Sequence, residues 1–209
     1  MNNLEELHFF STPVYAIEIP EFLDSVRQVA SDPLYHQHNL VDADGSLKMS
    51  STFFDDERIK DFSINVIQTS WDILKRQGYM MSNYQTIFES MWLQTHDKHS
   101  YMPQHTHANG NQIVGFYFTE LPKDGCKLIF HDPRIAKTQI DLDEADPSQI
   151  TVATKLVTMQ PKEGTLVLTN AWLAHSFSAN LSDENVKFVH INIGTQRIAN
   201  NQLEKPEII

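Results

Sequence analysis

The sequence predicts an α+β fold in which N-terminal helices back a β-sandwich or barrel. Two segments before about residue 80 carry apolar residues at helical spacing. The remainder is rich in aromatic and β-branched residues, and turn signals interrupt it at short intervals. Helices followed by a series of short strands are typical of this fold class.

The chain is expected to form one domain over residues 1–209, with helical support at about 20–80 and a β core at about 85–195. Its composition, 41% apolar and 21% charged, is that of a globular protein without a membrane partner. The N-terminal residues MNNLEELHFF lack the basic start and apolar run of a secretory signal. We therefore expect an unprocessed, cytoplasmic protein.

The net charge of −11 argues against a nucleic-acid partner, because phosphate binding requires clustered Lys and Arg. A small molecule or a protein side chain is the expected substrate class. The single cysteine, Cys126, excludes an intrachain disulfide and is interpreted as a small buried strand residue. The sequence leaves the oligomeric state open, with a homodimer as one alternative.

The N-terminal elements are read from apolar spacing and breakers. Residues 9–19 favour a strand that Pro20 ends, and residues 21–30 favour a short helix. Residues 35–54 have little periodicity and are expected to form a loop with a strand-like end. Residues 56–78 place apolar side chains on one face and end in glycine, which predicts the main helix.

The β core is expected to consist of short strands between turns. The candidate strands are residues 86–95, 113–119, 127–131, 151–159, 165–169 and 187–194. Turn signals separate them at residues 109–110, 123–125, 132–133, 161–164 and 182–185. The acidic stretch 139–150 is interpreted as a solvated excursion.

Histidine is unusually frequent, with ten residues against nine prolines and seven glycines. His105 and His107 lie two positions apart, and alternate side chains of an extended segment point the same way. The pair can therefore bind one metal ion, with His175, which follows the strand at 165–169, as the best third ligand. The alternatives are two solvated histidines at the pair, and a hydrogen-bonded strand-end histidine at 175.

Three passages together resemble a family of 2-oxoglutarate/Fe(II) oxygenases that is common in marine bacteria and their phages. They are FFSTPV; HTHANGNQIVGFYF with GCKLIFHDPR; and GTLVLTNAWLAHSF with VKFVHINIG. They extend from about Phe9 to Gly194, and LIFHDPR is specific to that family. The resemblance implies a prolyl-hydroxylase-like double-stranded β-helix, or cupin-like jelly roll, with Fe(II) and 2-oxoglutarate as cofactors.

The resemblance also implies individual roles. His105 matches the first ligand of the usual HxD pair, His107 stands where the carboxylate would be, and His175 matches the distal histidine. Three neutral imidazoles leave the iron one negative charge short of the commoner set. The alternative is that His107 lies near the metal without binding it.

The far carboxylate of 2-oxoglutarate requires a cation, which in this superfamily a basic residue on the strand after the distal histidine supplies. Lys187 is the candidate, with His190 and the hydroxyl of Tyr117 as further binding groups. Similar proteins have an arginine at the position of Val186, counted back from Asn192. Lys187 therefore requires a strand shifted by one residue, which would reverse the face of its side chain, or it is an ordinary exposed lysine.

Three more residues are candidates for contact with the substrate or with the ligands. Asp132 and Arg134 either pair to fix a turn or face the substrate at the mouth of the barrel, and Trp172 is either core or a substrate platform. The resulting hypothesis is an Fe(II)- and 2-oxoglutarate-dependent dioxygenase that hydroxylates a small molecule or a protein. The alternatives are a cupin-like three-histidine dioxygenase without 2-oxoglutarate and a non-catalytic jelly-roll binding module.

Overall fold

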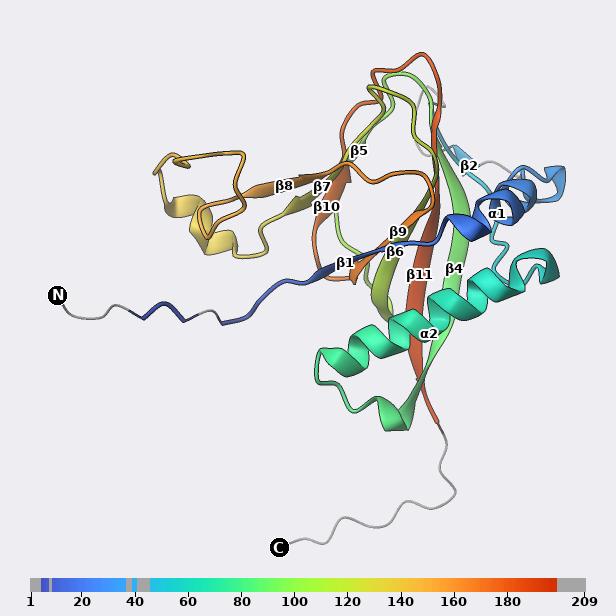
Figure 1. Ribbon diagram of the computed structural model, residues 1–209, viewed down its shortest axis with the longest axis horizontal. Coiled ribbons are helices and arrows are strands. Elements are labelled where there is room, and N and C mark those ends of the chain that lie inside the picture. The colour runs from blue at the N-terminus through green and yellow to red at the C-terminus, as the bar shows by residue number, and fades with distance from the viewer. Residues whose placement is uncertain (1–4, 8, 37–38, 41–45, 199–209) are drawn as a thin grey trace, which may run out of the picture.

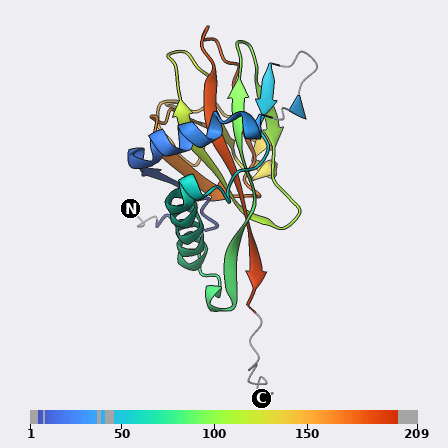
Figure 2. The same cartoon turned by 90° about the vertical axis from the view of Figure 1, so that its right-hand side faces the viewer.

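In the computed structural model, two antiparallel β-sheets lie face to face and two helices cover the outer side of the larger sheet (Figure 1). The structure describes residues 5–7, 9–36, 39–40 and 46–198. Figure 2, turned by 90°, shows both helices on one side of the long strands β4 and β11. The predicted α+β jelly roll is confirmed.

The larger sheet has seven strands in the order β1-β9-β6-β11-β4-β3-β2, and the smaller has four in the order β5-β10-β7-β8. The larger sheet contains β1 (Val14–Glu18), β2 (Asn39–Leu40), β3 (Leu47–Met49), β4 (Tyr84–His96), β6 (Asn111–Glu120), β9 (Thr165–Asn170) and β11 (Val186–Arg197). The smaller contains β5 (Met102–His105), β7 (Leu128–His131), β8 (Leu156–Met159) and β10 (His175–Phe177). Neighbouring strands can be far apart in sequence, as at the edge of the larger sheet, where β1 pairs with β9.

Both predicted helices are present, with shorter bounds. The helix α1 spans Leu23–Ala30 and follows a 3-10 turn at Pro20–Phe22, while α2 spans Lys60–Arg76. Further 3-10 turns are Pro33–Tyr35, Glu57–Ile59, Met81–Asn83 and Ile135–Gln139. In the segment expected as a loop, residues 37–38 and 41–45 lie outside the described residues, and β2 and β3 form a hairpin.

Alternation along the central strands separates two hydrophobic clusters. On β11, Val189, Ile191 and Ile193 pack on the helix side with α1 and α2. Val186 and Phe188 point between the two sheets and pack with residues of β6, β7, β9 and β10. The parity of a residue on β11 therefore decides whether its side chain faces the helices or the space between the sheets.

Two short strands, β5 and β10, were not predicted, and one predicted strand is much shorter. The predicted strand at 151–159 begins only at Leu156, because residues 151–154 form a turn that the Thr151 and Thr154 hydroxyls stabilise. The acidic excursion lies in the lobe between β7 and β8 at the left of Figure 1. Cys126 is buried as expected, and burial raises the pKa of its thiol to about 12.

None of the described helices is both long enough and apolar enough to span a membrane.

Candidate metal centre

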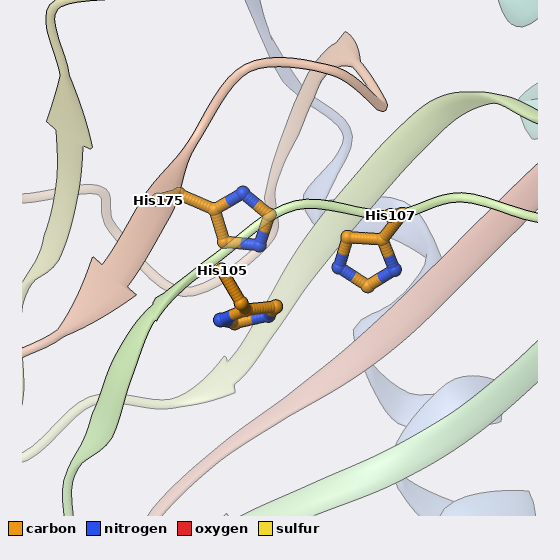
Figure 3. A group of neighbouring side chains, drawn as sticks. All are labelled: His105, His107 and His175. Carbon is orange, nitrogen blue, oxygen red and sulfur yellow. The ribbon is translucent and has the colours of Figure 1, made fainter.

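Three histidines meet where β5 and β10 pair in the smaller sheet. His105 ends β5 and lies directly across the ladder from His175, the first residue of β10. His107 follows β5, and its backbone N–H donates to the carbonyl of Ala171 at 2.9 Å. The chain turn after β9 thus holds the second histidine beside the third. Figure 3 shows the three rings gathered around one space.

The side-chain nitrogens of this cluster are close enough to bind one ion. One ligand atom from each of His105, His107 and His175 lies within 4.8 Å of the others. Ring centroids are 4.4 Å apart for His105 and His175, and 5.2 Å apart for each pair that includes His107. The spacing predicted from sequence is therefore present in the fold.

Backbone carbonyls determine which nitrogen of two rings is free. Nδ1 of His105 lies 2.8 Å from the carbonyl of Pro103, and Nδ1 of His175 lies 3.0 Å from that of Leu173. Because a carbonyl oxygen only accepts, each Nδ1 carries the proton and each Nε2 keeps its lone pair. Nε2 of His107 and Nε2 of His175 are buried without a hydrogen-bond partner, as expected of metal ligands.

Burial keeps the rings of His107 and His175 uncharged. Desolvation lowers the pKa of His107 to about 4 and that of His175 to about 3, and the neighbouring histidines add to both shifts. Both rings are therefore neutral at physiological pH, which is the form that binds metals. The arrangement can hold one divalent ion through three neutral imidazoles and leave further coordination positions open.

A fourth histidine borders the cluster. The ring of His190 lies 4.9 Å from that of His107 and stacks on the indole of Trp92 at 4.2 Å. His190 is buried, and desolvation holds its pKa well below 6.5. Nδ1 of His190 and Nε1 of Trp92 are buried without a partner. The amide of Asn192 raises the pKa of His107, against the larger effect of burial.

Two residues that were expected to bind 2-oxoglutarate face away from the cluster. Lys187 shares its side of β11 with Val189 and pairs with Glu120 at 3.1 Å. Tyr117 packs on Phe62 of α2, and its hydroxyl donates to the carbonyl of Ile19. Both expectations are wrong, because the alternation of side chains along β11 and β6 places Lys187 and Tyr117 on the helix side of the sheet. Among the residues that the structure describes, no Lys or Arg is buried.

Of the remaining predicted residues, Arg134 and Trp172 are exposed, whereas the side chain of Asp132 is largely buried. Arg134 binds Asp132 through two hydrogen bonds of 2.9 and 2.8 Å, and Lys137 binds the same carboxylate at 3.0 Å. These charges are used within the turn that follows β7. Trp172 lies in the turn between β9 and β10 and is 49% exposed, so it is not a core residue. Its position three residues before His175 is compatible with the predicted substrate platform.

The predicted site did not include the aromatic residues that surround the histidines, because aromatic residues on the flanking strands are more often part of the core. Trp92 lies directly across β4 and β11 from His190, and strand pairing of this kind is not readable from one sequence. Phe116 contacts both His175 and His190, with ring centroids 5.1 Å away in each case. For β11 the sequence did contain a signal. Phe188 and Asn192 lie two positions before and two positions after His190, so strand alternation places all three side chains on one face.

Comparison with protein families gives a match over residues 90–188 to the family described as "Putative 2OG-Fe(II) oxygenase". The matched segment runs from within β4 to the start of β11 and includes all three histidines of the cluster. Comparison with curated protein sequences gives no match.

The fold is similar to solved structures. A Pseudomonas putida prolyl-4-hydroxylase has a TM-score of 0.60 at 9% identity, with 90% of this chain and 95% of that chain covered. HygX from Streptomyces hygroscopicus, with nickel and 2-oxoglutarate bound, has a TM-score of 0.54 at 11% identity, with 88% and 83% covered. A prolyl hydroxylase from Trichoplax adhaerens, in complex with a peptide fragment of hypoxia inducible factor, has a TM-score of 0.53 at 12% identity, with 87% and 83% covered.

These likenesses establish the fold, and the family match adds the chemistry. Residues 90–188, the segment that carries the histidine cluster, match the model of the 2OG-Fe(II) oxygenases, and this match indicates an oxidoreductase that uses Fe(II) and 2-oxoglutarate.

Proposed function

We propose that His105, His107 and His175 bind Fe(II) and that the enzyme hydroxylates a small molecule or a protein side chain in the cytoplasm. One observation carries the assignment of the ligands: three imidazoles offer nitrogens within 4.8 Å of one another at the junction of two strands. The buried Nε2 atoms of His107 and His175 lack any other partner. An all-histidine set fits Fe(II), which imidazole binds well.

The protein's contribution is to orient the ligands and to keep them neutral. The carbonyls of Pro103 and Leu173 fix the rings of His105 and His175. Iron, when bound, supplies the oxygen chemistry of the reaction. Because three imidazoles add no negative charge, the centre favours an anionic ligand such as a 2-oxo acid at its open positions.

His190 is the one of the three predicted co-substrate residues that faces the cluster, and we assign it to contact with the co-substrate. Its position next to His107 and its unpartnered Nδ1 support this role. The exposed indole of Trp172 remains the best candidate for substrate contact, because it precedes His175 by three residues and lies at the surface. Asp132 and Arg134 would act on the substrate only indirectly, through the turn that they stabilise.

The test is an anaerobic titration of the Fe(II)-loaded protein with 2-oxoglutarate. Chelation of the 2-oxo acid to iron is expected to produce a weak visible charge-transfer band, and admission of air should produce succinate. If iron binds without a band and without succinate, the co-substrate assignment is wrong. If iron does not bind at all, the histidine assignment is wrong. A substrate set of small molecules and peptides, scored by succinate formation, then separates the two substrate classes.

A further inference from the structure

We propose that this enzyme recognises a 2-oxo acid by the end that binds the metal and does not discriminate for a second carboxylate at the far end. The proposal rests on the proposed function of the histidine cluster. It concerns the wall of the site formed by the inner faces of β4, β6 and β11, and the chemical class of co-substrate that this wall accepts.

The wall beyond the histidines is aromatic. Phe116 contacts the rings of both His175 and His190. Behind it, Phe177 and Phe188 stack with ring centroids 4.5 Å apart and an angle of 14° between the planes. Phe116 packs edge-on against both of them, at 5.5 and 5.9 Å. A ligand chain that extends from the metal toward this side meets this aromatic group, which the buried ring of His96 borders at 5.5 Å from Phe177 and 5.7 Å from Phe188.

The alternation of side chains along β11 places its only lysine on the face opposite to this wall. Val186 and Phe188 occupy the inner positions on either side of Lys187, and both are fully buried in the cluster between the sheets. The ammonium group of Lys187 points to the other face and pairs with Glu120. The position where similar oxygenases carry a cation is therefore an aliphatic side chain in this chain.

The electrostatic surroundings are consistent with the packing. In the described part of the chain, the ionisable groups that influence His190 are three other histidines, His107, His175 and His105. Four polar atoms of the wall are buried without a partner: Nδ1 of His190, Nε1 of Trp92, Oδ1 of Asn192 and Oε1 of Gln94. The ring of His96, on the same face of β4, is hydrogen-bonded to Gln94 and Ser100. A buried carboxylate without a cation is unfavourable, whereas an apolar tail gains from the same contacts.

The neutral donors have a different use. They lie between His107 and the aromatic group, since the ring of His190 is 4.9 Å from that of His107 and 5.1 Å from that of Phe116. Trp92 stacks directly on His190. Both are placed for the oxygen atoms of a 2-oxo acid close to the metal. Recognition is thus concentrated at the metal-binding end of the co-substrate, and the far end is selected by its fit to the aromatic group.

The experiment compares two ligands with the same five-carbon chain, 2-oxoglutarate and 2-oxopentanoate, which end in a carboxylate and in a methyl group respectively. Each is titrated calorimetrically into the full chain loaded with Fe(II), without oxygen. Iron binding is measured first and separately. We expect 2-oxopentanoate to bind as tightly as 2-oxoglutarate or more tightly. Binding of 2-oxoglutarate more than tenfold tighter than 2-oxopentanoate would overturn the proposal and leave the proposed function intact.

Two variants sharpen the comparison. Lys187→Met removes the outward lysine and should leave both affinities unchanged; a selective loss of 2-oxoglutarate affinity would overturn the proposal. Phe188→Arg introduces a cation on the inner face, and in a folded protein it should shift the ratio of affinities toward 2-oxoglutarate by at least tenfold. The wild-type ratio decides the question even where this variant does not fold.

If iron binds and neither 2-oxo acid does, both the proposal and the co-substrate assignment fail, in favour of a three-histidine dioxygenase without a 2-oxo acid.

Discussion

At the scale of single residues, the side of the strand on which a group lies determines its role more than its chemistry does. His105, His107 and His175 could be predicted because two of them are close in sequence on an extended segment and the third follows a clear strand. Lys187 and Tyr117 were chemically suitable but lie on the helix side of β11 and β6. Bulges between these two strands, after Lys187 and after Ile193, make such parity hard to read from sequence.

Tyr117→Phe tests the structural role of that hydroxyl. The variant loses the hydrogen bond to the carbonyl of Ile19, which keeps only the 3.3 Å bond from the N–H of Phe22, so the free energy of unfolding should fall by about 1 kcal/mol. The affinity for 2-oxoglutarate should not change, because the ring faces α2. Urea unfolding and calorimetric titration of the iron-loaded protein measure the two quantities. A selective loss of 2-oxoglutarate affinity with unchanged stability would return Tyr117 to the site.

At the scale of elements, the long strands and both helices could be predicted because periodicity accumulates over many residues. The strands that position the histidines could not. β5 has four residues and β10 has three, too few for alternation to be recognised, and their existence depends on partners far away in the chain. The site is therefore built at the junction of the two elements that sequence reasoning missed, although its ligands were identified.

The turn into β9 gives a test at the same scale. Gly164 has φ of +81° and its carbonyl accepts from the N–H of Ile19, while an added Cβ would lie 2.8 Å from the Cα of Pro20. Gly164→Ala should therefore destabilise the protein by more than the 1–2 kcal/mol that a left-handed conformation costs. Gly110→Ala is the matched control, because φ is +91° there and the space around it is open. Equal losses in urea unfolding would show that the contact with Pro20 is unimportant.

At the scale of the whole molecule, the larger sheet has a different task on each face. Its outer face packs on α1 and α2 through one hydrophobic cluster, and its inner face forms the second cluster and the wall beside the histidines. The overall fold class followed from the order of helices and strands. The pairing of β1 with β9 could not be predicted in this way, because the two strands are far apart in sequence.

Burial of several neutral histidines makes the stability of the metal-free protein depend on pH. The folded-state pKa values of His107, His175 and His190 lie below 6.5, so the unfolded chain binds more protons in the interval below that value. Stability is fully present above pH 6.5 and declines as the pH falls toward 5, where most carboxylates are still ionised. Each such histidine contributes up to about 1.4 kcal/mol per pH unit.

Urea unfolding of the metal-free protein between pH 7.5 and 5 measures this dependence. His190→Phe removes one of the buried imidazoles. The free energy of unfolding should then change less steeply with pH, by an amount that corresponds to at most one bound proton. A free energy of unfolding that stays constant over this interval would show that the buried histidines are not neutral in the folded state or not desolvated.

The most direct test of the metal centre is an anaerobic Fe(II) titration of the wild type and four single histidine-to-alanine variants. His131 is the matched control, since it lies on the strand next to His175 and its Nε2 binds the hydroxyl of Ser176 at 2.8 Å. We predict one iron per chain, binding at least tenfold weaker in His105→Ala, His107→Ala and His175→Ala, and wild-type binding in His131→Ala. Wild-type binding in His107→Ala would contradict the three-histidine centre and leave iron with two protein ligands.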